Sequence, residues 1–560
     1  MGVPVPEEFM GRNLLQPTDH PYALGYFGGK AYYYSADLSF VSTLDEPTPD
    51  REEKDALANY VMYNYVERHL KYMPSLKGTY FLSLLSIGEE PSGGTTRRRF
   101  LPWFICKECM LMQENVPPSF GRRMKKILEV MVPILITQLA ITGMNLADTI
   151  MSGHAGTAEL AGGAIGANIW MPIFTGLNGI LQALTPIVAN YRGAKAYEKI
   201  SGAVFSGLML ALILSVSIIS VGILQLDKVL SLMNLESSVE VVSHNYLSYV
   251  AMGIVPLFGA SILRSFVDTM GYTQLTMRLF LLTMPVNCFM NYLFIFGKLG
   301  LPRMGGAGAG VGTAITCWLL FLSFSFLVTH LGVFRSFRVF DRTGFSFSHL
   351  REHLRVGIPM GVAIFLETSI FGVECLFVSR FGTVTVAANQ AAMSFTNLLY
   401  MVPLSFSLSL TIIIGAFVGA KDYAAARLYG RTGRVGNVMV GLSFAVFLLV
   451  GRTLIARLYT QDPSLVAPIE HFLGFAIAFQ LCDSTAAPIQ GILRGYKDVK
   501  ATFYSSLAAY WVLALPIGLV MDYGFHKEAD GYWMGLISGI FFSALFLTLR
   551  LRYIEKKYHA

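Results

Sequence analysis

The sequence predicts an all-α membrane protein with 12 transmembrane helices in two six-helix lobes, preceded by a soluble or irregular N-terminal extension. Of the 560 residues, 54% are hydrophobic and only 14% are charged, and the mean hydropathy is +0.52. Soluble globular proteins carry about 25% charged residues, so this composition indicates an integral membrane protein. Apolar runs of membrane-spanning length also recur from residue 127 onward.

The twelve predicted helices follow these apolar runs in chain order. Each run is close to or above the roughly 20 residues that cross the hydrocarbon core. The predicted spans are 127–147, 158–182, 202–224, 243–266, 275–297, 308–330, 353–378, 385–417, 433–451, 466–491, 502–522 and 531–550. The long second and eighth spans contain Pro172 and Pro403, which predicts kinks or tilt.

Residues 1–121 form a different kind of sequence, and their role stays open. They carry 15 acidic residues and 11 Lys or Arg, without an apolar run long enough to span a bilayer. Cys106 and Cys109 have CxxC spacing, but a zinc site needs a second pair of ligands, and no convincing pair follows. We therefore favour an ordinary solvated segment over a metal site.

Basic residues are distributed unevenly between the two sets of loops. One set is flanked by 24 Lys and Arg residues and the alternate set by seven. Because cytoplasmic loops carry the excess of Lys and Arg, both termini are predicted to be cytoplasmic. Residues 333–356 then form a cytoplasmic linker between an N-lobe (122–332) and a C-lobe (357–560).

The two lobes share short motifs at one constant spacing. Gly156-Thr157 recurs as Gly382-Thr383, and Gly193-Ala194-Lys195 recurs as Gly419-Ala420-Lys421 at the same offset along the chain. Equal offsets indicate a duplicated six-helix bundle, and an even helix number gives both copies the same membrane orientation. A cleft between two such lobes can open to each side in turn. The repeat therefore favours a transporter, although channels and receptors can also be duplicated.

Acidic residues inside the predicted helices are the candidate cation-binding or coupling residues. An acid at membrane depth is costly unless it binds an ion, pairs or faces a cavity. Glu367 and Asp483 lie too deep in their helices to be explained as caps. They form one possible Na⁺ site. Asp148 is a further candidate, with helix capping as its alternative.

Glu374 is the remaining candidate, and the offset between the repeats places it opposite Asp148. Its alternative is an ion pair with Arg380 near the membrane surface. We interpret Asp268 and Arg264, four residues apart, as a structural pair.

Neutral polar residues complete the predicted N-lobe site. Asn287 and Asn291 share one face of a helix, and Thr313 adds a hydroxyl. With Asp148 they offer oxygen ligands for Na⁺ or a proton relay, while helix–helix hydrogen bonding is the alternative for the asparagines. Gln390 and Asn397 are predicted to contribute polar contacts to a substrate cavity.

Several motifs resemble those of multidrug and toxic compound extrusion (MATE) transporters of the bacterial NorM type. They are ADTIMSGHAGTAELAG (147–162), LQALTPIVANYRGAK (181–195), PVNCFMNYLFIFG (285–297), GIPMGVAIFLE (357–367), FGTVTVAANQAAMSFTNLLYMVPLSFSLSLTI (381–412) and LRGYKD (493–498). The resemblance spans residues 122–553, about three quarters of the chain. The family's acids, paired polar residues and bent-helix proline fall on Asp148, Glu367, Asp483, Asn287, Asn291 and Pro133.

The resemblance implies a secondary antiporter in the bacterial inner membrane that exports cationic, amphipathic drugs or toxic organic compounds in exchange for Na⁺ or H⁺. We expect no cofactor besides the coupling ion, no nucleic-acid partner and a monomer in the lipid bilayer. The sequence has no P-loop, HExxH or GxSxG motif, so we predict no enzymatic activity. A flippase for a lipid-linked saccharide and a membrane receptor or channel are the alternatives.

The chain departs from the family pattern at three places. The usual AAHQ reads AANQ, with Asn389 in place of histidine, so a proton role at that residue is lost. Glu374 is an acid where an apolar residue is expected, which changes the charge of the C-lobe interior. Residues 1–121 have no counterpart in the pattern.

Overall fold

The computed structural model describes residues 22–27, 30–35, 40–44, 119–233, 235–341 and 346–559. The first three ranges are the strands β1 (Tyr22–Phe27), β2 (Lys30–Ser35) and β3 (Phe40–Leu44), which form an antiparallel sheet in the order β1-β2-β3. We predicted no structure for this segment, although its tyrosines and phenylalanines are typical of strands. Cys106 and Cys109 lie outside the described residues, so the CxxC hypothesis stays untested.

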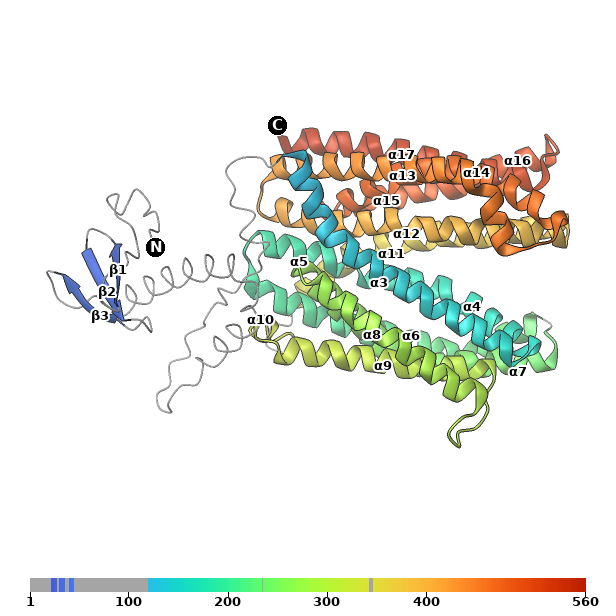
Figure 1. Cartoon of the computed structure of the whole chain (residues 1–560), viewed down its shortest axis with the longest axis horizontal. Helices are drawn as coiled ribbons and strands as arrows, with labels where there is room; N and C mark the ends of the chain where they lie inside the picture. Colours follow the sequence, from blue (N-terminus) through green and yellow to red (C-terminus); the bar gives the residue numbers. More distant parts are fainter. Residues whose placement is uncertain are drawn as a thin grey trace. The chain divides into compact units, whose positions relative to one another are not determined.

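Twelve spans among the described residues are long and apolar enough to cross a membrane, which confirms the predicted all-α membrane fold. The N-lobe contains α3 (Phe120–Ala155), α4 (Thr157–Leu181), α5 (Leu184–Gly193), α6 (Tyr197–Leu232), α7 (Ser237–Thr269), α8 (Thr273–Phe296) and α9 (Gly306–His330). The short α10 (Gly332–Arg335) follows. The C-lobe contains α11 (Phe347–Val378), η5 (Ser379–Phe381), α12 (Thr383–Gly419), α13 (Tyr423–Tyr459), α14 (Pro463–Gly495), α15 (Val499–Ser506), η6 (Leu507–Ala514), α16 (Leu515–Tyr523) and α17 (Glu528–His559) (Figure 1).

Several helices extend beyond the apolar windows that predicted them. α3 begins at Phe120, so the four basic residues within 122–126 are helical. α11 begins at Phe347 behind a Ser346 cap whose side chain accepts a hydrogen bond from the Ser348 N–H, and it therefore includes residues 347–356 of the predicted linker. Hydropathy marks only the part of a helix that sits in hydrocarbon, whereas the backbone ladder continues into the polar flanks.

The duplication inferred from short motifs extends through the whole bundle. The starting residues of α4 and α12, α6 and α13, α7 and α14, and α8 and α15 are separated by the same offset as the repeated motifs. Even the backbone of the connecting turns is repeated, since Lys195 and Lys421 both adopt left-handed conformations with φ of 55° and 60°. Residues related by this offset can therefore be compared as structural counterparts.

The helix α3 packs against the cores of both lobes. Its first half contributes Ile127, Val130 and Ile134 to a buried cluster with Phe406 and Leu410 of α12. Its second half contributes to the N-lobe core. α3 is continuous through Pro133, and the Thr137 hydroxyl donates to the Pro133 carbonyl at 2.8 Å, a contact that helps to bend helices.

The lobes meet closely at the end of the bundle that carries the start of α3, α10 and the end of α17, here called the basic end (Figure 1). A Cβ on Gly193 would lie 1.8 Å from the Ala416 carbonyl oxygen, and a Cβ on Gly419 would lie 2.0 Å from the Asn190 carbonyl oxygen. The matched glycines of the two repeats thus let α5 and α12 touch backbone to backbone.

Polar groups from both lobes join the same contact. The Asn190 amide donates to the Gly495 carbonyl at 3.1 Å. The Lys497 ammonium lies 2.8 Å from Glu352, which also accepts a hydrogen bond from the Tyr191 hydroxyl. These contacts reinforce the backbone contact between the lobes at the basic end.

Candidate cation and substrate site

A cavity of about 480 Å³ lies within the N-lobe and reaches the lobe interface. Side chains of α3, α4, α7, α8 and α9 form most of its lining. The C-lobe closes one side with Leu404, Leu408 and Ile412 of α12. Its volume is in the range of pockets that hold drug-sized ligands, about 300–1,000 Å³.

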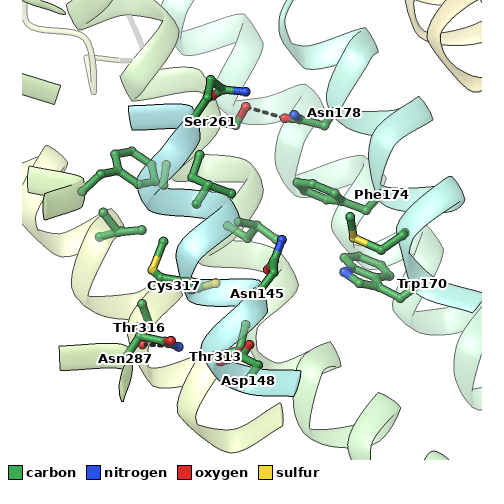
Figure 2. A pocket seen from close by; sticks show the side chains of 18 of the residues that line it. Asn145, Asp148, Trp170, Phe174, Asn178, Ser261, Asn287, Thr313, Thr316 and Cys317 are labelled. Atoms are coloured by element: carbon green, nitrogen blue, oxygen red, sulfur yellow. Dashed lines mark hydrogen bonds between the residues drawn. The ribbon is translucent and has the colours of Figure 1, made fainter. Parts of the chain in front are cut away.

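Asp148 is one of the two acidic residues in the cavity lining, and three helices meet around it (Figure 2). Asn291 of α8 donates an amide hydrogen bond to Oδ1, and the Thr313 hydroxyl of α9 donates to Oδ2 at 3.2 Å. Asn291 also donates to Asn287 Oδ1 at 3.4 Å. The four side chains that the sequence singled out for the N-lobe site are therefore brought together, although their role in binding stays a prediction.

The helix α9 makes room for this cluster through a glycine. A Cβ on Gly312 would lie 2.2 Å from Asn291 Oδ1, so α8 and α9 can approach only with a glycine at this position. The amide of Asn287 is held by a hydrogen bond that it donates to the Thr316 hydroxyl at 3.5 Å. Asn291 Oδ1 is buried without a hydrogen-bond partner and faces Gly312 of α9, whereas the NH₂ group of the same amide faces Asp148.

Aromatic side chains form the wall of the cavity contributed by α4 (Figure 2). The rings of Trp170 and Phe174 lie 5.7 Å apart, and Phe174 stacks on Phe258 at 6.2 Å. An aromatic face near a carboxylate attracts organic cations through the ring quadrupole in addition to apolar contact. The cavity therefore offers a flat apolar wall and the carboxylate of Asp148 to a ligand.

A second polar group lies in the cavity lining on α7. Arg264 and Asp268 form the predicted pair, with Nε 3.4 Å from Oδ2, and Arg264 donates to Gln138 Oε1 at 3.0 Å. All three side chains line the cavity, which the sequence did not indicate. Arg264 is the single Lys or Arg among the described residues of this lining, and Asp268 offsets its charge. A pyrophosphate-binding flippase needs several unpaired cations there.

Glu367 and Asp483 interact electrostatically in the C-lobe and lie outside the cavity lining. Tyr510, on the π-helical segment η6, donates its hydroxyl to Glu367 Oε1 at 3.3 Å. π-helical turns often occur at functional sites. Asp483 is 5% exposed, and its Oδ2 has no hydrogen-bond partner. This carboxylate oxygen is therefore available to bind a cation.

Arg494 is a member of this C-lobe group that the sequence did not reveal. Its position suggested one of the basic residues flanking a loop, yet it is 5% exposed and interacts electrostatically with Glu367. It donates to Gln490 Oε1 at 3.3 Å. Two acids and one arginine give this group a net charge of −1 when all three are ionised, which matches one monovalent cation. Arg494 follows the predicted span 466–491 and lies in the last turn of α14, so hydropathy gave no signal that it is buried.

Glu374 does not form an ion pair with Arg380, which the sequence suggested as the alternative to cation binding. Arg380 instead binds Asp522 at 2.6 Å and Tyr532 at 2.8 Å. Glu374 is buried and accepts a hydrogen bond from Asn389 at 3.5 Å. The two side chains at which the sequence departs from the family pattern are therefore in contact.

Gln390 and Asn397 are exposed on α12 and do not line the cavity. Their proposed contact with substrate thus has no support from this cavity. Among the described residues, no three His, Cys, Asp or Glu side chains cluster as a metal site. The uncharged side chains beside Asp148 carry amide and hydroxyl oxygens, a donor type that suits Na⁺ better than a transition metal.

Comparisons with known proteins agree with this architecture. The MatE family model matches residues 133–293 and 359–520, and the two stretches begin at the offset of the repeated motifs. The chain is 41% identical over 441 residues to a probable multidrug resistance protein NorM of Bacillus subtilis, covering 78% of this chain and 97% of the relative. A probable NorM of Halalkalibacterium halodurans is 43% identical over 435 residues, covering 78% and 95%.

Solved structures share the fold at lower sequence identity. The eukaryotic MATE transporter AtDTX14 superposes with a TM-score of 0.70 at 20% identity, covering 77% of this chain and 96% of that chain. A MOP superfamily transporter from Pyrococcus furiosus gives a TM-score of 0.72 at 19% identity, covering 78% and 97%. With the twelve spans and the duplicated lobes, the family match shows that the chain belongs to the MatE family of NorM-like membrane transporters.

Proposed function

We propose that this transporter is a secondary antiporter that exports cationic, amphipathic organic compounds in exchange for Na⁺ or H⁺. The observation that carries the proposal is the half-buried Asp148, held by Asn291 and Thr313 in a cavity of about 480 Å³ with an aromatic wall. The relatives named as probable multidrug resistance proteins support export of drugs in general.

In this mechanism, positive charges bind at two acidic sites, one in each lobe. Asp148 attracts a positive charge in the N-lobe cavity, and the group of Glu367, Asp483 and Arg494 holds one cation in the C-lobe. Binding of the coupling cation at either site favours the conformation that has released the drug. Drug and ion therefore compete, directly or through the conformation, for the same negative charges.

The test is ethidium export in everted membrane vesicles. Asp148→Asn, Glu367→Gln and Asp483→Asn remove one charge each with little change in volume, and each is expected to abolish or strongly slow ion-driven export. Expression and thermal stability of the purified variants serve as controls for folding. If Glu367→Gln and Asp483→Asn both export ethidium at the wild-type rate, the C-lobe acids do not couple transport.

The coupling ion is identified by imposing one gradient at a time. Vesicles with a sodium gradient and no pH difference are compared with vesicles that have only the pH difference. Export under one condition alone names the ion, and export under neither condition overturns the antiport mechanism.

The proposal also includes the membrane topology. The basic end faces the cytoplasm of a bacterial inner membrane, both termini are cytoplasmic, and the transporter is a monomer. An alkaline phosphatase fusion after the last residue is expected to be inactive and a green fluorescent protein fusion to fluoresce. An active phosphatase fusion contradicts this topology.

A further inference from the structure

Glu374 of α11 has an environment unlike that of the other membrane acids. The residue is 3% exposed. Its Oε2 accepts one long hydrogen bond, from Asn389 Nδ2 of α12 at 3.5 Å, and its Oε1 is buried without a partner. A buried carboxyl group with one unsatisfied oxygen needs an explanation.

The asparagine beside it is held in one orientation. Trp533 of α17 is fully buried, and its indole N–H donates to Asn389 Oδ1 at 2.8 Å. An indole nitrogen can only donate, so this bond turns the Asn389 NH₂ group toward Glu374. Three helices, α11, α12 and α17, thus contribute to the contact.

The surroundings provide no positive charge for an ionised Glu374. Ile370 and Val378, one turn away on either side of Glu374 on α11, are buried in the apolar C-lobe cluster that also contains Ala388. Arg380 is engaged by Asp522 and Tyr532. Among the described titratable groups, the Cys375 thiol of the same helix interacts electrostatically with Glu374. Burying a carboxylate without a counter-charge is unfavourable, whereas the neutral acid avoids the loss of hydration of a charged group.

The environment also excludes a metal ion. Na⁺ needs several oxygen ligands, but the Asn389 oxygen is occupied by Trp533 and its NH₂ group faces Glu374. The repeat counterpart Asp148 differs, because it receives hydrogen bonds from both Asn291 and Thr313 and lines an open cavity. The counterpart sites therefore present different chemistry at equivalent positions.

We propose that Glu374 is a proton-binding site of the C-lobe, occupied by H⁺ in this conformation and selective for H⁺ over Na⁺. It is the repeat counterpart of Asp148, so each lobe carries one acid at this level of its first helix. Release of the proton requires α11 to separate from α12 or α17, so that water reaches the carboxyl group. This coupling of release to rearrangement rests on the proposed antiport function, whereas the protonated state does not.

The test is infrared difference spectroscopy of the purified full-length chain. A buried protonated carboxyl group gives its own carbonyl band, and we expect one such band to be absent in Glu374→Gln at neutral pH. Asp148→Asn is the matched control and should retain that band. Adding NaCl should leave the band unchanged. A wild-type spectrum identical to that of Glu374→Gln, or loss of the band on adding Na⁺, overturns the proposal.

A second variant tests how the site is held together. Trp533→Phe keeps an aromatic ring and removes the donor that orients Asn389, so the Glu374 band should shift while remaining present. An unshifted band contradicts the role given to Asn389 and Trp533. These spectra require no transport, so failure of ethidium export in vesicles and failure of the proton site are distinguishable.

Discussion

At the scale of single residues, the hydroxyl of Thr313 gives a sharp test of the N-lobe cluster. It donates to Asp148 Oδ2 at 3.2 Å, and valine has nearly the same shape without the donor. A hydrogen bond to an ionised group contributes about 1.5–3 kcal/mol. We expect Thr313→Val to change the coupling-cation concentration for half-maximal ethidium export by about tenfold or more, since about 1.4 kcal/mol corresponds to tenfold. The concentration should rise if the ion is Na⁺, which loses an oxygen ligand, and fall if it is H⁺, because the ionised form of Asp148 loses a stabilising donor.

The matched control lies on the same helix. Thr329 is exposed, and its hydroxyl donates to the backbone carbonyl of Ser325 at 2.8 Å. Thr329→Val makes the same chemical change away from the cavity and should leave the cation dependence unchanged. Equal effects of the two substitutions would mean that the hydroxyl at Thr313 has no specific role.

The residue scale also shows where the sequence was informative. Asp148, Asn287, Asn291 and Thr313 were selected by residue type and helical spacing, and they lie in one hydrogen-bonded cluster. Arg494 was missed because a basic residue at a helix end usually reaches solvent, and only packing shows that it is buried.

At the scale of helices, the approach of α8 and α9 depends on Gly312. A methyl group there would lie 2.2 Å from Asn291 Oδ1 and would push that amide away from Asp148. We expect Gly312→Ala to lower the free energy of unfolding by about 1–3 kcal/mol, as in other overpacked interiors. Ethidium export should fall toward the level of Asp148→Asn. Thermal unfolding in detergent and vesicle export measure the two effects.

Gly222 provides the control for this helix contact. It lies inside α6, and an added Cβ would meet no atom within 4 Å. Gly222→Ala should leave export unchanged and preserve or slightly increase stability, because alanine favours helix by about 1 kcal/mol over glycine. A loss of export in this variant as large as in Gly312→Ala would show that helix rigidity, not the position of Asn291, is responsible.

At the scale of the whole molecule, Gly193 and Gly419 hold the lobes together at the basic end. A Cβ on Gly193 would lie 1.8 Å from the Ala416 carbonyl oxygen, and a backbone atom cannot rotate away. We expect Gly193→Ala to separate the lobes at this end and to slow export severalfold. Pulsed electron paramagnetic resonance between labels on the exposed positions Lys195 and Lys421, in a cysteine-free background, should report a longer distance than in the parent.

Gly474 offers a matched substitution away from the lobe contact. It lies within α14, with no atom within 4 Å of an added Cβ. Gly474→Ala should leave the label distance and export unchanged. An unchanged distance in Gly193→Ala would contradict the assignment of this glycine pair to lobe closure.

The sequence by itself determined the membrane class, the helical spans, the duplication and the identities of the candidate acids. These features depend on residue type and on spacing along one chain, so hydropathy and the constant offset of the repeated motifs were sufficient. Only the tertiary structure decided which polar side chains meet, because Asp148 and Asn291 lie far apart in the chain and come together through helix packing. Packing likewise decided that α3 contributes to both lobes and that Glu374 meets Asn389 and not Arg380.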